Sequence, residues 1–130
     1  MSLQDKINKV IEFHEVFGLE YRKSPDAMLS ERIIQLRHRL MAEENDEYLD
    51  ACRDNDISQI ADALGDKLYI LLGTIIAHGL QNKIEEVFDE IHRSNMSKLD
   101  ANGKPIYRED GKIMKSDRYF LPDIKKVLEL

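Results

Sequence analysis

The stretch that decides the fold of this chain is LMAEENDEYLDACRDNDISQIADALGDKLYILLGTIIAHG, residues 40–79. Apolar residues recur every three or four positions on both sides of the polar segment Asp54–Asp56, which predicts two helices joined by a short turn. A turn of this length makes the two helices antiparallel neighbours. The second helix, expected over about residues 57–78, is apolar on nearly every side, so we expect it to be buried all round.

Both predicted helices carry carboxylates where a helix facing a core should be apolar. On a helical wheel, Glu44 lies near the middle of the apolar arc of the first helix, Glu47 lies within that arc, and Glu43 lies at its edge. On the second helix, Asp62 and Asp66 are four residues apart and share one stripe. A carboxylate removed from water is costly or becomes protonated unless a positive group pairs with it.

A hard divalent cation would resolve this conflict. Of the basic side chains, Arg37 and Lys67 lie on these faces only obliquely, whereas Mg²⁺ and Mn²⁺ take carboxylate oxygens as ligands. The opposite interpretation is that some of the acids lie on solvated helix faces, and we favour it for Glu43 taken alone. For the other four acids as a set we favour a metal site, with one or two cations between facing helices.

The composition fits one soluble helical domain. The chain has 130 residues, which is enough for one domain with a hydrophobic core and too few for two domains of usual size. Of these residues 42% are hydrophobic and 34% are charged, as in a soluble helical protein. The net charge of −6 argues against a general nucleic-acid binder. We find no apolar run long enough for a bilayer, no signal peptide pattern and a single cysteine, Cys52, so we expect a cytoplasmic protein without contact to membranes.

The flanking sequence predicts further helices and one hairpin. Turn signals at Asn102–Gly103 and Asp110–Gly111 bracket short β-prone segments, which favours a small two-stranded hairpin. We expect an all-α antiparallel bundle of four to five helices with this C-terminal β-hairpin extension. It would be a single domain, residues 1–130, with a helical core over 1–98 and the hairpin and terminal helix over 99–130. The helices are expected over residues 3–17, 30–53, 57–78, 82–95 and 122–130.

The predicted fourth helix ends in a cluster of hydrogen-bond donors, Arg93-Ser94-Asn95-Met96-Ser97-Lys98. Phosphate oxygens bind such groups, but an ordinary helix end also carries basic residues that complement the helix dipole, and the cluster alone leaves both interpretations open. His14 lies on or near the apolar stripe of the first helix, and we expect it to be a packed or surface histidine and not a metal ligand. Neither a P-loop nor a Glu-x-x-His pair occurs, so metal–carboxylate chemistry stands out.

These residues together resemble a known family. Glu43-Glu44-x-x-Glu47, followed by Ala61-Asp62-Ala63-Leu64-Gly65-Asp66-x-Leu68-Tyr69, is similar to the all-α NTP pyrophosphohydrolases of the MazG and phosphoribosyl-ATP pyrophosphohydrolase-like group. Segments 12–18, 92–98 and 103–112 extend the similarity over nearly the whole chain. Many members carry a second acidic pair three residues apart. Here that position is Ala63 and the acid is Asp62, which leaves the identity of the fourth ligand and the number of metals open.

The resemblance implies a metal-dependent enzyme. It would hydrolyse a nucleoside triphosphate between the α- and β-phosphates, giving the monophosphate and pyrophosphate, with Mg²⁺ or Mn²⁺ as cofactor. Glu44, Glu47 and Asp66 would be the core metal ligands and Asp62 a fourth. Glu43 would complete a second metal site or accept the proton of the attacking water, so Glu43 and Glu47 are the acids assigned to catalysis.

The resemblance also implies a substrate site and partners. Asn95 and Lys98 would hold the phosphates or the base edge, with Lys115 and Tyr119 as weaker candidates. A homodimer or tetramer is expected. Two alternatives stay open, namely phosphoribosyl-ATP as the substrate, and a catalytically inactive helical scaffold or regulatory module.

Overall fold

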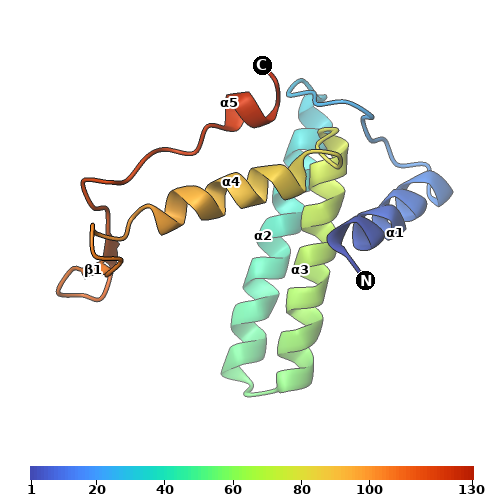
Figure 1. Cartoon of the computed structure of the whole chain (residues 1–130). Coiled ribbons are helices and arrows are strands. Elements are labelled where there is room, and N and C mark those ends of the chain that lie inside the picture. The colour runs from blue at the N-terminus through green and yellow to red at the C-terminus, as the bar shows by residue number, and fades with distance from the viewer. The chain divides into compact units, whose positions relative to one another are not determined.

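The computed structural model describes all 130 residues and contains five helices and one two-stranded sheet (Figure 1). This confirms the all-α class with a small hairpin near the C-terminus. The chain divides into two compact units, Met1–Asn82 and Lys83–Leu130. The boundary between the units precedes the fourth helix, whereas the sequence suggested a change of character after residue 98. That all 130 residues act as one domain stays a prediction.

The first unit consists of three helices whose ends follow from local sequence. They are α1 (Leu3–Val16), α2 (Glu31–Arg53) and α3 (Ile57–Ala77). Ser30 caps α2 by accepting a hydrogen bond from the backbone N–H of Ile33, and Asp56 caps α3 in the same way. These caps confirm the predicted starts of both helices within one or two residues.

The core of the first unit lies where α3 packs against α2 and α1. The two longest helices run side by side and antiparallel, and α1 contacts α3 (Figure 1). Every fully buried hydrophobic side chain of the protein belongs to this unit, because only here do three amphipathic helices share an apolar interior. These side chains are Ile7, Val10, Ala51, Ala63, Leu72, Ile76 and Ala77.

The expectation that α3 is buried all round is wrong for the single chain. Leu64, Leu68 and Leu71 are exposed by 49%, 49% and 43%, since α1 and α2 cover only part of the helix. A stripe of large apolar side chains therefore faces outward along α3. No helix in the structure combines the length and the apolarity needed to cross a membrane.

The segment between α1 and α2 is tied to the end of α3. The backbone N–H of Arg22 donates to the carbonyl of Ile76 (3.1 Å), and that of Asp26 donates to the carbonyl of His78 (2.9 Å). Gly79 has a φ of +71°, and a Cβ there would lie 2.0 Å from the carbonyl oxygen of Ser24. Only glycine fits at position 79. The residue predicted to end α3 therefore also lets the segment around Ser24 pack closely against the end of this helix.

The second unit holds α4 (Ile84–Met96), β1 (Ile106–Tyr107), β2 (Ile113–Met114) and α5 (Ile124–Val127). The strands pair antiparallel, with Ile106 opposite Met114. The hairpin is therefore confirmed, although its strands are only two residues long. The last helix begins after its Asp123 cap as predicted but is shorter than the predicted range.

Candidate functional site

Three acids on two helices converge in the first unit. Glu44 and Glu47 lie one turn apart on α2, and Asp66 lies on α3, which runs alongside it. One carboxylate oxygen from each of the three lies within 4.8 Å of the others. We call this set the acidic group. It consists of the three residues that the family resemblance implied as the core metal ligands.

Glu44 is the member of the acidic group that is least exposed to water. It is half-buried, and its Oε2 is buried without any hydrogen-bond partner. Burial raises the pKa of the Glu44 carboxyl above its ordinary value, and contact with Glu47 and the charges of Asp66 and Asp62 raise this pKa further. An orphaned buried oxygen among like charges is a place that a cation would stabilise, so the residues present fit a hard divalent metal ion.

No basic side chain neutralises the acidic group. None of the ion pairs in the protein includes Glu44, Glu47 or Asp66. Lys67, which lies nearby in sequence, donates from its Nζ to the amide oxygen of Asn45 at 2.8 Å. Arg37 donates to α3 further along the helix pair. The two cations that the sequence placed obliquely on these faces are therefore engaged elsewhere.

An open hollow of about 300 Å³ adjoins the acidic group. Its wall includes Glu47, Asp50, Gln59 and Asp62. Asp62 thus lies beside Glu47 at the hollow and not among the three converging oxygens. Sequence reasoning missed Asp50 and Gln59. The signal for Asp50 was available, because it lies three residues after Glu47 and so on the same side of α2.

Glu43 lies outside the acidic group. It is exposed, and its Oε1 lies 3.9 Å from Nε of Arg39 one turn earlier on α2. An exposed pair of this kind contributes little to stability. Glu47, Asp62 and Asp66 are exposed as well, so the burial cost inferred from the helical wheel falls on Glu44 alone. The other acids were expected in a core because α3 was expected to be covered all round.

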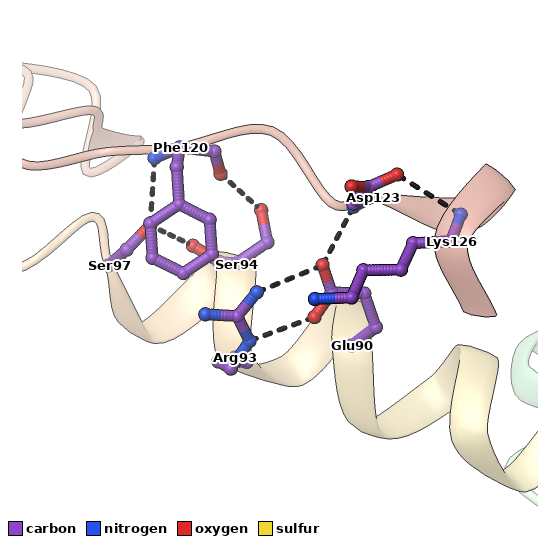
Figure 2. Close-up of polar contacts among 7 residues, drawn as sticks. All are labelled: Glu90, Arg93, Ser94, Ser97, Phe120, Asp123 and Lys126. Carbon is purple, nitrogen blue, oxygen red and sulfur yellow. Dashed lines mark hydrogen bonds and ion pairs between the residues drawn. The ribbon is translucent and has the colours of Figure 1, made fainter.

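In the second unit, most of the hydrogen-bond donors at the end of α4 bind other groups of the same unit, chiefly Glu90 and Phe120 (Figure 2). The Ser94 hydroxyl donates to the carbonyl of Phe120 (2.8 Å), and the N–H of Phe120 donates to the Ser97 hydroxyl (3.1 Å). Arg93 binds the Glu90 carboxylate and stacks over the Phe120 ring, 4.4 Å from its centroid. Arg93, Ser94 and Ser97 are therefore structural.

The proposed substrate-binding residues all belong to the second unit. Asn95 is exposed and Lys98 half-buried, and neither side chain forms a hydrogen bond or an ion pair within the chain. Lys115 places its Nζ 4.8 Å from the ring centroid of Tyr119. The structure thus brings together Lys115 and Tyr119, and it leaves Asn95 and Lys98 with free polar ends.

The sequence was compared with families and with curated proteins. The comparison with curated proteins finds no match. The sequence pattern of the family described as phosphoribosyl-ATP pyrophosphohydrolase matches residues 10–95, which include the whole acidic group and end at Asn95. Lys98, Lys115 and Tyr119 lie beyond the match. The chain belongs to the phosphoribosyl-ATP pyrophosphohydrolase family and is a pyrophosphohydrolase of the MazG-like superfamily, a hydrolase that acts on acid anhydrides.

Proposed function

We propose that this pyrophosphohydrolase acts on a nucleoside triphosphate, cleaving between the α- and β-phosphates to release the monophosphate and pyrophosphate. One observation carries the proposal. Carboxylates from α2 and α3 converge at Glu44, whose Oε2 is buried and has no hydrogen-bond partner in the chain. An uncompensated acidic site of this kind suits the binding of a metal–phosphate complex.

The metal ion of this proposal is Mg²⁺, with Mn²⁺ as a substitute. Glu44, Glu47 and Asp66 would hold it, because one carboxylate oxygen of each lies within 4.8 Å of the other two. When bound, such an ion neutralises phosphate charge and lowers the pKa of a coordinated water. Asp62, at the wall of the adjoining hollow, is our candidate for a fourth ligand.

The chain's own residues supply proton acceptance and positioning in this proposal. Glu47 faces both the acidic group and the hollow, so it is the better placed of the two acids assigned to proton transfer. Glu43 would need to leave Arg39 to take part. Asn95 and Lys98 have free donors for phosphate oxygens. Lys115 and Tyr119 stay weaker candidates because they already contact each other.

We also propose that the protein is a cytoplasmic homodimer or tetramer. The outward-facing stripe on α3, with Leu64, Leu68 and Leu71 exposed, supports this assembly. Large apolar side chains along one helix are typical of a surface that another protein covers. Size-exclusion chromatography with light scattering tests the assembly directly, and a monomer at micromolar concentration would contradict it.

The test of the activity is a panel of ribo-, deoxyribo- and modified nucleoside triphosphates, with Mg²⁺, with Mn²⁺ and with a chelator. We expect metal-dependent release of pyrophosphate and monophosphate from at least one member. Release of orthophosphate would show that the cleavage position is wrong. The panel includes phosphoribosyl-ATP, because the matched family carries that name. Turnover of phosphoribosyl-ATP alone would replace the triphosphate proposal with this second candidate.

The same panel distinguishes an enzyme from a catalytically inactive helical scaffold. A scaffold would release nothing from any member and would gain no stability from Mg²⁺. Stabilisation by Mg²⁺ without activity on any member of the panel would support the metal site and contradict the proposed substrates.

A further inference from the structure

Arg37 is a buried guanidinium without a counter-charge. The residue is 8% exposed, and no carboxylate forms an ion pair with it. Its Nε donates to the hydroxyl of Thr74 (3.0 Å), and its Nη2 donates to the carbonyl of Ile70 (2.7 Å). A guanidinium has five N–H groups, so Arg37 keeps three without a partner in the chain. Nη1 has no partner and is not fully buried, so it can donate to water or to a ligand.

The guanidinium lines a pocket of about 260 Å³ within the first unit. The wall includes Leu36 and Arg37 from α2, Ala77 from α3 and His14 from α1. Arg32 and Glu20 lie at the same pocket, and Glu20 has an exposed side chain 4.0 Å from Arg22. Pockets for whole drug-sized ligands measure roughly 300–1,000 Å³, so this pocket lies just below that range and has room for a small chemical group.

Gly73 shows that the sequence makes room for this arrangement. A Cβ at position 73 would lie 2.6 Å from Nη2 of Arg37 and 3.2 Å from Nε2 of His14. Gly73 is helical and has no positive φ, so its glycine is explained by space and not by backbone conformation. The missing side chain on α3 lets the guanidinium from α2 and the imidazole from α1 converge.

The pocket is separate from the acidic group but lies along the same pair of helices. Arg37 precedes Glu44 by seven residues on α2, and Gly73 follows Asp66 by seven on the antiparallel α3. Seven residues make two helical turns, about 10 Å. Along this seam the charge therefore changes sign, from three carboxylates to a guanidinium.

We propose that the pocket around Arg37 binds a phosphate group. A guanidinium with three free N–H groups matches phosphate oxygens, and the two positive charges of Arg37 and Arg32 outweigh the exposed carboxylate of Glu20 at the same pocket. The phosphate is either free inorganic phosphate or one end of a nucleotide whose remainder lies outside the pocket. The site is independent of the proposed activity, because its test needs neither a bound metal nor turnover.

The first experiment titrates the full chain with inorganic phosphate in the presence of EDTA and follows the histidine ring resonances by NMR. We expect a saturable shift of His14, while His38 and His92, which are exposed, stay unchanged. The absence of a saturable shift would overturn the proposal. So would a weak, parallel drift of all the histidines, which indicates general ionic binding.

The second experiment compares Arg37→Gln with Arg53→Gln. Both remove one positive charge from α2, but Arg53 is exposed in the last turn and forms no ion pair. We expect Arg37→Gln to weaken phosphate binding at least about tenfold and Arg53→Gln to leave it unchanged. Equal effects of the two variants, or full affinity in Arg37→Gln, would overturn the proposal.

Two further arms complete the design. Arg37→Lys keeps the charge but loses the fork, so it should fold if Arg37→Gln does not, and it should bind phosphate more weakly than the parent. A nucleoside monophosphate titrated in the same way identifies the source of the phosphate. Tighter binding than inorganic phosphate, with the same His14 shift, assigns a nucleotide, and equal binding assigns the free anion.

Discussion

Two glutamates of this protein lie in opposite surroundings, one in each unit. Glu90 in α4 is 9% exposed and fully partnered. Its carboxylate accepts from Nε of Arg93 (2.8 Å), from Nη2 of Arg93 (3.2 Å) and from the backbone N–H of Asp123 (2.7 Å) (Figure 2). Glu44 in α2 has a buried oxygen with no partner and two acids beside it.

The pKa values of the two carboxyls shift in opposite directions. Hydrogen bonds from Arg93 and from Asp123 lower the pKa of Glu90, whereas burial and neighbouring acids raise the pKa of Glu44. Glu90 completes a structure, because its donors come from the chain itself. Glu44 lacks such donors, and this incompleteness distinguishes a binding site from a structural network.

The largest effect is expected from Glu47→Gln. Loss of one charged ligand from the acidic group should lower turnover by at least about 100-fold, since metal sites lose this much when their ligand environment is damaged. The metal-free variant should be as stable as the parent or more stable, because one of the repelling carboxylates is gone. Steady-state pyrophosphate release and thermal unfolding in EDTA measure the two outcomes.

The matched control for this variant is Asp89→Asn. Asp89 is an exposed acid on α4 that forms no ion pair, so the substitution removes the same charge away from the acidic group. Its activity should equal that of the parent. Full activity in Glu47→Gln would remove Glu47 from the mechanism.

The next effect is the stabilisation of the folded protein by Mg²⁺. If Mg²⁺ binds only the folded state, a concentration 100 times its dissociation constant adds about 2.7 kcal/mol to the free energy of unfolding. Glu47→Gln and Glu44→Gln should lose most of this gain, whereas Glu90→Gln should keep it, because no acid of the Glu90 network belongs to the acidic group. Denaturant unfolding with and without Mg²⁺ checks this, and an equal loss in all three variants would break the contrast.

A smaller, local effect is expected from Glu90→Gln. The amide cannot accept both donors of Arg93 together with the N–H of Asp123, so the segment that carries Phe120 should be held less firmly on α4. Hydrogen exchange at Asp123 and Phe120 should accelerate about tenfold. The helix α4 itself should keep its protection. Unchanged exchange at Asp123 would show that the Ser94 and Ser97 contacts suffice.

The helices and most of the acids near Glu44 could be predicted from the sequence. Local signals predicted the elements, because the caps at Ser30 and Asp56 and the stop at Gly79 act through neighbouring backbone atoms. Wheel geometry and a short turn placed four acids on facing stripes of α2 and α3, and three of them, all but Asp62, converge in the structure.

What the sequence missed depends on residues far apart along the chain. The role of Ser94 and Ser97 stayed open in the sequence, because the contact that decides it comes from Phe120, more than twenty residues later. Arg37 looked oblique to the helix faces, but Gly73 gives it room inside the first unit. The exposed stripe of α3 was expected in the core because hydropathy does not say how much of a helix its neighbours in the chain cover.

The smallest effect is the pH dependence of the contact between Glu90 and the backbone of Asp123. The pKa of Glu90 is lowered from its ordinary value of 4.5, so its unfolded form takes up a proton first as the pH falls. The stabilising contribution is therefore fully present above about pH 4.5 and is lost as the pH falls through the lowered pKa. The amide resonance of Asp123 should titrate in this acidic range and become flat in Glu90→Gln. A midpoint above 4.5 would reverse the sign and place Glu90 in the same class as Glu44, whose pKa is raised by burial and by neighbouring acids.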